Sequence, residues 1–258
     1  MTLVGFAAAR SCGVTTTVLA LARAWTDGGA LIAELDAAGG SLALRHDLRP
    51  EPGLTTLAAA ARRGLSASSI SQHCQRLPDG TPVLLGPVGS EQASSALDVL
   101  GIRLVAQLDA LEELDVLADL GRLDARRSPG ALLAAVDHLV LVLRPSLEGV
   151  AQARACIEEL GIAPQRLAVV CIGDRPYRAS EAAAALGAPL VGVLPDDPRA
   201  ALRLGAPGRD RRSTLVRPAL EVAGRLQRAI AQTPQGATSS TSRWARPGPS
   251  AQLVEGRR

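Results

Sequence analysis

The residues best placed to do chemistry lie in a short loop near the N-terminus. The loop follows an apolar run, Leu3–Ala8, and leads into three threonines and a helical pattern. A strand, a loop of small residues and a helix N-terminus form the layout in which backbone N–H groups face phosphates. In such a loop, Gly13 lets the backbone approach a phosphate, Thr15 offers its hydroxyl to Mg²⁺ and Thr16 contacts the α-phosphate.

The positive charge that such a loop normally carries is missing. Val14 stands where a phosphate-binding loop has lysine, and all 28 Lys and Arg residues of the chain are arginine. Arg10 is the loop's one cation, followed by Ser11, Cys12 and Gly13. Arginine does not copy the compact, flexible charge of lysine. The pattern alone leaves two interpretations open: a phosphate site, or a tight strand-to-helix turn capped by threonine.

Carboxylates follow two further apolar runs. Glu34 and Asp36 end the run 30–35, just before a glycine turn, and Asp119 lies near the end of the run 114–120. Ligands of open α/β sheets bind at the carboxyl ends of the strands. Asp36 is therefore placed to orient a water molecule, and Asp119 to hold a metal-bound one. A strand that simply ends in a polar turn is the alternative.

Apolar runs and helical patterns alternate through residue 205. Uninterrupted runs such as LVLVL are typical of strands buried on both faces of a parallel sheet. The alternation predicts a three-layer α/β fold with a mainly parallel central sheet flanked by helices. The expected strands are 3–8, 30–35, 83–85, 114–120, 138–143, 167–172 and 190–194; the expected helices are 15–25, 54–63, 91–107, 146–160, 180–186 and 215–231, with Gly101 dividing the third.

Composition places limits on the class of protein. The chain is 47% hydrophobic, with four scattered cysteines and a net charge of +3 that is too even to imply nucleic-acid binding. Neither a signal peptide nor a run of about 18 apolar residues is present, so we expect a cytoplasmic protein. We expect one folded domain over residues 1–232. The tail 233–258 is rich in Pro, Ser, Thr, Gly and Arg and is expected to be disordered.

Two C-terminal features have alternative interpretations. Arg209, Arg211 and Arg212 could touch DNA phosphates, but Asp210 interrupts the cluster and a solvated linker is favoured. The helix 215–231 is expected to pack on the domain rather than bind a membrane, because it carries no bulky aromatic residue. Any membrane association is therefore expected to be indirect.

Taken together, these segments resemble the MinD/ParA class of P-loop ATPases over roughly residues 2–205. The stretch 14–22, VTTTVLALA, is similar to the class pattern KTTTAVNLA, and 34–43, ELDAAGGSLA, is similar to its DxDPQGN. The stretch 186–198, LGAPLVGVLPDDP, resembles its late G-P-V-hydrophobic-G-x-I/L-P segment. The altered loop looks most like the CpaE/TadZ branch, whose members are tied to Flp/Tad-type pilus or secretion machines.

The resemblance implies a homodimer that binds ATP and Mg²⁺ and uses nucleotide state to choose a protein partner or a cell location. It implies that Thr15 ligates Mg²⁺, that Asp36 orients the attacking water and that Asp119 lies near the metal. The residues expected to contact the cofactor are Arg10, Ser11, Cys12, Gly13, Val14, Thr15, Thr16 and Asp119.

The chain departs from the class at its two lysines, which fall at Ala9 and Val14. Losing both cations is expected to remove on the order of several kcal/mol of transition-state stabilisation, which leaves weak or no ATP hydrolysis. The class's adenine-reading Asn is also missing, and Asp174 is expected to cap a turn. The expected role is a positioning or scaffolding factor. An active ParA-type ATPase in chromosome or plasmid partitioning, and an interaction module that binds no nucleotide, are the alternatives.

Overall fold

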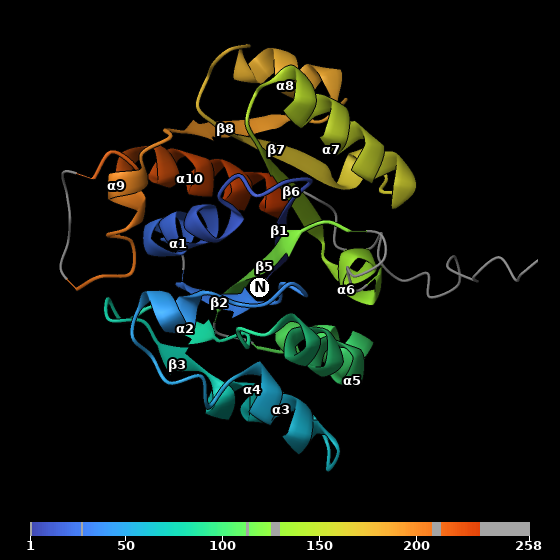
Figure 1. Cartoon of the computed structure of the whole chain (residues 1–258), viewed down its shortest axis with the longest axis vertical. Helices are drawn as coiled ribbons and strands as arrows, with labels where there is room; N and C mark the ends of the chain where they lie inside the picture. Colours follow the sequence, from blue (N-terminus) through green and yellow to red (C-terminus); the bar gives the residue numbers. More distant parts are fainter. Residues whose placement is uncertain (1, 27, 112–113, 125–129, 208–212, 233–258) are drawn as a thin grey trace, which may run out of the picture.

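The computed structural model describes residues 2–26, 28–111, 114–124, 130–207 and 213–232 (Figure 1). In this part of the chain, eight strands form a single sheet in the order β3-β4-β2-β5-β1-β6-β7-β8. The strands are β1 (Leu3–Ala8), β2 (Ala30–Glu34), β3 (Gln75–Arg76), β4 (Pro82–Leu84), β5 (Asp115–Arg122), β6 (His138–Leu143), β7 (Leu167–Ile172) and β8 (Leu190–Leu194).

All strand pairs are parallel except β3 with β4. The carboxyl ends of the parallel strands therefore meet at one edge of the sheet, and β1 lies in the interior of the strand order between β5 and β6. The loop that follows β1 is consequently flanked by the ends of these two strands. This arrangement places the predicted loop and the predicted carboxylates at the same edge.

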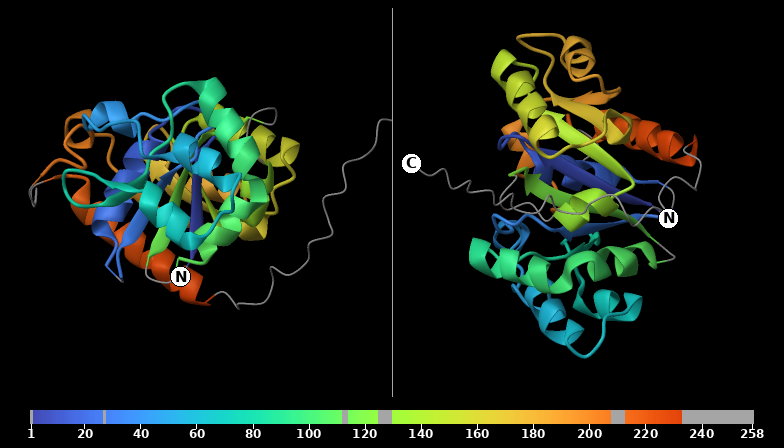
Figure 2. Two further views of the ribbon diagram at one scale, coloured as in Figure 1. Left: turned by 90° about the horizontal axis from the view of Figure 1, so that it is seen from below. Right: turned by 90° about the vertical axis from the view of Figure 1, so that its right-hand side faces the viewer.

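Helices cover both faces of the sheet, which confirms the predicted three-layer architecture (Figures 1 and 2). The buried side chains of the helices on one face, which include α5, belong to one hydrophobic core cluster. Those of the helices on the other face, which include α1, belong to a second cluster. The first layer contains α3 (Leu54–Ala61), α4 (Ala67–His73), α5 (Ser90–Asp109), α6 (Gly130–Ala135), α7 (Leu147–Glu159) and α8 (Ala179–Ala185); the second contains α1 (Val14–Ala24), α2 (Leu42–Arg45), α9 (Pro198–Ala201) and α10 (Val216–Gln232).

Strand β6 shows why uninterrupted apolar runs become central strands. Its residues alternate between the two faces of the sheet, so that Leu139 and Leu141 join one core cluster while Val140 and Val142 join the other. A strand covered by helices on both faces has no side that faces water, and every position after His138 is buried. The same logic accounts for the fully buried strand β1.

The C-terminal helix α10 packs on the domain, as predicted. Ala219, Val222 and Leu226 are buried against the α1 side of the core. The close approach to β8 depends on Gly192, because a Cβ there would lie 2.5 Å from Cγ2 of Val222. No helix among the described residues is long and apolar enough to cross a membrane. The tail 233–258 and the arginine cluster at 209–212 lie outside the described residues.

Candidate functional site

The loop after β1 ends at Gly13, which serves as the N-cap of α1. Gly13 has φ 104°, a left-handed conformation that suits glycine, and among the described residues no side chain caps the helix start. Its carbonyl accepts two hydrogen bonds of 2.9 Å, from the backbone N–H and the hydroxyl of Thr17. The buried Thr17 thereby holds the loop's last turn, while the first N–H groups of α1 are left for a ligand.

Val14 does not face a ligand in the way a phosphate-binding lysine would. Its side chain is 6% exposed and packs into the core cluster beneath α1. Cys12 is also committed to the fold, because its Sγ donates a hydrogen bond to the Val142 carbonyl on β6 at 3.0 Å. Burial raises the pKa of Cys12 to about 11, although the Arg144 charge opposes this. Cys12 is therefore a neutral thiol that ties the loop to β6.

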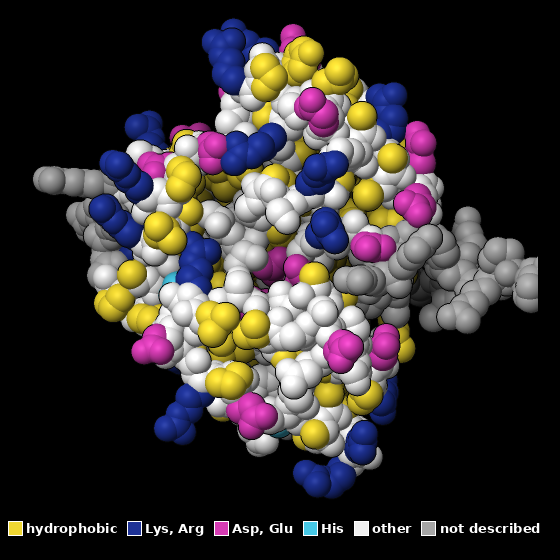
Figure 3. Space-filling view, in the orientation of Figure 1, with side chains coloured by type: hydrophobic (Ala, Val, Ile, Leu, Met, Phe, Trp, Pro, Cys, Tyr) yellow, Lys and Arg dark blue, Asp and Glu magenta, His cyan; other side chains and the backbone are white. Residues whose placement is uncertain are grey.

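Three carboxylates converge beside this loop from β2 and β5. Glu34 and Asp119 are partners in the parallel register of these strands, and both are buried, at 2% and 1% exposure. Asp36 follows β2 and is partly buried. Figure 3 shows acidic side chains on the floor of a hollow in the middle of this face, with arginine side chains around it. The structure thus brings together the carboxylates that the sequence placed far apart.

Glu34 is occupied by the backbone. Its Oε1 accepts hydrogen bonds from the N–H groups of Ser41 at 2.6 Å and Leu42 at 3.0 Å, and its Oε2 accepts one from Gly86 at 3.0 Å. Burial raises the pKa of Glu34, and these three N–H groups oppose the rise. Glu34 therefore fastens the start of α2 and the segment after β4 to the end of β2.

Asp36 is held next to Gly121, at the end of β5. Its Oδ1 accepts a 2.7 Å hydrogen bond from the Ala38 N–H. Gly121 has φ 61°, and a Cβ at this position would overlap the Asp36 carboxylate. Burial raises the pKa of Asp36, whereas the nearby Arg122 charge lowers it. The glycine thus provides the space in which Asp36 lies.

Asp119 has the most altered acidity in the site. Burial raises its pKa to about 7, a hydrogen bond with the Thr15 side chain and the Gly121 N–H lower it, and the charges of Glu34 and Asp36 raise it. The Gly121 N–H donates to Oδ1 at 3.0 Å. Thr15, the predicted Mg²⁺ ligand, and Asp119, the carboxylate predicted to lie near the metal, are therefore in contact.

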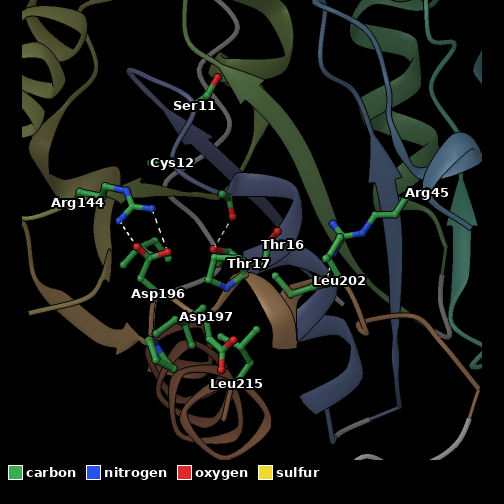
Figure 4. A pocket seen from close by; sticks show the side chains of 16 residues that line it. Ser11, Cys12, Thr16, Thr17, Arg45, Arg144, Asp196, Asp197, Leu202 and Leu215 are labelled. Carbon is green, nitrogen blue, oxygen red and sulfur yellow. Dashed lines mark hydrogen bonds and ion pairs between the residues drawn. The ribbon is translucent and has the colours of Figure 1, made fainter. Parts of the chain in front are cut away.

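On the other side of the loop lies a cavity of about 570 Å³ (Figure 4). Its wall is formed by the loop, the start of α1, α2, the residue after β6, the end of β7, and the segment from the end of β8 into α9. Residues of the predicted contact set that line it are Ser11, Cys12, Gly13 and Thr16. Much of the remaining wall is apolar, including Ile172, Leu194 and Leu215.

The sequence analysis missed the charged residues of this cavity. Arg144 forms a two-pronged ion pair with Asp196, with Nη2 and Oδ1 3.0 Å apart, as Figure 4 shows. Arg45 donates to the Ala201 carbonyl, and its buried Nε has no partner among the described residues. Arg144 directly follows β6, so the rule that ligands meet strand ends would have singled it out. Arg45 gave no such signal, because α2 is a four-residue helix.

Arg10 and Asp174, the other residues singled out in the sequence, differ in their environment. Arg10 is exposed on the loop and has no hydrogen bond or ion pair within the described part of the chain. Asp174 caps a turn, as predicted: its Oδ1 accepts a 2.6 Å hydrogen bond from the Ala179 N–H at the start of α8. Among the described residues, no group of three or more His, Cys, Asp and Glu is arranged to hold a metal ion.

Comparison with known proteins identifies the fold. No protein-family profile and no curated protein matches the sequence. Solved structures do match: a ParA family ATPase from Chlorobium tepidum has a TM-score of 0.69 at 18% identity, covering 87% of this chain and 98% of the other. MinD of Pyrococcus horikoshii complexed with Mg-ADP has a TM-score of 0.69 at 16% identity, covering 89% and 97%. McdA of Cyanothece in an ATP complex has a TM-score of 0.61 at 18% identity, covering 88% and 96%. The chain has the fold of MinD/ParA-type P-loop ATPases.

Proposed function

We propose that this chain binds ATP with Mg²⁺ at the loop after β1 and acts as a positioning or scaffolding factor with weak or no ATP hydrolysis. The observation that carries the proposal is the contact between Thr15, at the uncapped start of α1, and Asp119, within β5 near its carboxyl end. This contact joins a phosphate-facing helix N-terminus to a carboxylate at the sheet edge where ligands bind.

The residues on this side of the loop fit a magnesium–phosphate group. Mg²⁺ is usually bound through one or two protein oxygens together with substrate phosphates, not in an all-protein cage. Thr15 supplies one hydroxyl oxygen, and Asp119 supplies a carboxylate close to it. Bound Mg²⁺ would neutralise phosphate charge, and its field would favour the ionised form of Asp119.

The cavity beside Thr16 fits the nucleoside part of the ligand. Thr16, in the first turn of α1, lines this cavity together with the loop, so a phosphate contacted by Thr16 would direct the rest of the nucleotide into it. Apolar side chains such as Ile172 and Leu194 offer surfaces for a base, and the Arg144–Asp196 pair offers polar groups at the wall. Asp36, on the opposite side, is placed to orient a water molecule toward the terminal phosphate.

Weak hydrolysis is proposed because Ala9 and Val14 replace the two lysines of the class. Val14 is buried in the core, and Ala9 has no charge to offer a partner subunit. Removing preorganised positive charge from a phosphoryl-transfer site costs several kcal/mol in the transition state. Nucleotide binding can persist, since the N–H groups of the loop and of α1 do not depend on lysine.

We further propose that the chain works as a homodimer with a protein partner in a Tad/Flp-type pilus or secretion machine. The support is the resemblance of the altered GVTTT loop to the CpaE/TadZ branch. Imaging of the tagged protein in its own host tests this role. The proposal expects foci at the secretion ATPase and loss of pili on deletion; normal pili and diffuse signal would overturn the assignment.

Phosphate release and sedimentation test the biochemical part. In the phosphate-release assay, we expect ATP turnover close to that of a buffer blank and unchanged in Asp36→Ala. In sedimentation, we expect a larger species with Mg·ATP than without nucleotide. Robust turnover that disappears in Asp36→Ala would contradict the weak-hydrolysis proposal. An active partitioning ATPase would additionally show ATP-dependent, salt-sensitive binding to non-specific DNA.

A further inference from the structure

Positive charge reaches the phosphate-facing loop from the two strands beside β1. Arg122 is the last residue of β5, and Arg144 directly follows β6. In the β1–β5 register Arg122 pairs with Ala8, the residue just before the loop, and the neighbouring Leu123 N–H donates to the Ala8 carbonyl at 2.8 Å. The backbone therefore places one arginine on each side of a loop that has lost its lysine.

The two arginines differ in what they already bind. Arg144 is paired with Asp196 and faces the cavity proposed for the nucleoside. The Arg122 side chain is exposed and makes no hydrogen bond or ion pair within the described part of the chain. Its guanidinium is nevertheless close enough to Asp36 to lower the pKa of that carboxyl. Arg122 is thus the arginine that remains available for a ligand.

The surroundings of Arg122 are strongly acidic. The charge of Asp36 raises the pKa of Glu34, and the charges of Glu34 and Asp36 raise the pKa of Asp119. Among the described residues, Arg122 is the one cation whose charge lowers the pKa of any of these three carboxyls, that of Asp36. A triphosphate brought to this edge lies near three carboxyl groups, of which Glu34 and Asp119 are buried, and its terminal phosphate needs a positive group nearby. Since the nucleoside cavity lies toward β6, the terminal phosphate lies toward β5, on the side of Arg122.

We propose that Arg122 takes over, within the same subunit, the part of the missing loop lysine by binding the terminal phosphate of the nucleotide. This inference rests on the proposed function, because it assumes that a nucleoside triphosphate occupies the loop. A guanidinium donates two parallel hydrogen bonds to phosphate oxygens and stays charged at all physiological pH values. Arg122 then favours triphosphate over diphosphate and monophosphate, whereas Arg144 contacts the part of the ligand that all three share.

Calorimetric titration of the full chain with Mg·ATP, Mg·ADP and AMP tests this assignment. We expect Arg122→Gln to weaken ATP binding about tenfold or more while AMP binding changes by less than about threefold, and Arg122→Lys to recover part of the loss. Arg144→Gln is expected to affect the three nucleotides alike. Arg62→Gln, an exposed change at the end of α3, is the surface control, and thermal melting checks that each variant is folded.

Arg10→Gln is the competing variant, because Arg10 is the loop's own cation. A selective loss of ATP binding in Arg10→Gln, with Arg122→Gln unchanged, would overturn the inference and leave the proposed function intact. Equal losses for ATP and AMP in Arg122→Gln would also overturn it, since they would indicate a merely structural role. No binding of any nucleotide by the unaltered protein would overturn the proposed function and this inference together.

Discussion

Three neighbouring carboxylates of this site have three different tasks. Glu34 is saturated by backbone N–H groups, Asp36 lies in space left open by Gly121, and Asp119 contacts Thr15. Their sequence context alone does not separate them, because each simply ends an apolar run. What separates them is the number of N–H groups and the degree of burial that the folded chain provides.

Replacement of Gly121 tests how Asp36 is held. In Gly121→Ala the new Cβ overlaps the Asp36 carboxylate and strains a backbone with φ 61°. Gly187→Ala is a matched control, because its φ is 65° and a Cβ there meets nothing within 4 Å. We expect both variants to lose about 1 kcal/mol from backbone strain, and Gly121→Ala to lose at least about 1 kcal/mol more in urea unfolding. Equal losses in the two variants would show that Asp36 does not occupy this space.

The acidity of Asp119 predicts how stability depends on pH. Its pKa is about 7 in the folded chain against 3.8 for the free side chain, so the folded state holds a proton that the unfolded state has lost between these values. The free energy of unfolding therefore falls as pH rises from about 4 to 7 and levels off above. Between pH 6 and pH 8, Asp119 alone accounts for a loss of about 1 kcal/mol.

Urea unfolding at pH 6 and pH 8 measures this fall. Asp119→Asn should remove this decrease in the free energy of unfolding, whereas Asp98→Asn, an exposed change on α5, should retain it. His46 and His138, whose pKa values are lowered by burial, contribute a slope of the opposite sign that is common to all three proteins. An identical pH dependence in the unaltered protein and in Asp119→Asn would refute the assignment of a buried, near-neutral carboxyl.

At the scale of elements, the apolar patterns predicted every parallel strand and the longer helices, whereas several short elements were missed. The predicted bounds of β1, β6, β7 and β8 agree with the structure, and Gly101 interrupts α5 as expected. The two-residue β3 and the helices α2, α4, α6 and α9 were missed, because helices of four to seven residues contain too few turns to show a clear period, although the equally short α8 was predicted.

The loop and carboxylates of the site could be predicted for the same reason, because each follows a long buried strand. Arg144 could have been predicted by the same rule, because it directly follows β6, whereas Arg122 and Arg45 could not. The expected strand 114–120 stops short of Arg122, whereas β5 continues to residue 122. Arg45 depends on α2, whose position is set by the contact of Glu34 with Ser41 and Leu42. These are tertiary effects that no local pattern carries.

Glu34 connects β2, α2 and the segment after β4, and its replacement tests this connection. A glutamine has one acceptor oxygen, so Glu34→Gln leaves the Gly86 N–H facing an amide donor. We expect a loss of about 1–3 kcal/mol in unfolding free energy, measured at neutral pH. Glu91→Gln, at an exposed position of α5, should change stability by less than about 0.5 kcal/mol. A Glu34→Gln protein as stable as the unaltered chain would contradict this bracing role.

At the scale of the whole molecule, the sheet edge divides into two halves on either side of the loop after β1. Thr15, Asp36, Asp119 and Arg122 lie on the β5 side, and the cavity with Arg144 lies on the β6 side. One face thus provides a carboxylate-lined end and an apolar end for an elongated ligand. The proposed nucleotide would span both, with its phosphates over the start of α1.

Calorimetric titration with Mg·ATP, comparing the unaltered protein with Thr15→Ala, tests the central claim most directly. Thr55→Ala, an exposed threonine in the first turn of α3, is the matched control. We expect a dissociation constant in roughly the micromolar range, weakened about tenfold or more in Thr15→Ala and unchanged in Thr55→Ala. No heat of binding by the unaltered protein at millimolar ATP would contradict the claim that this loop binds a nucleotide.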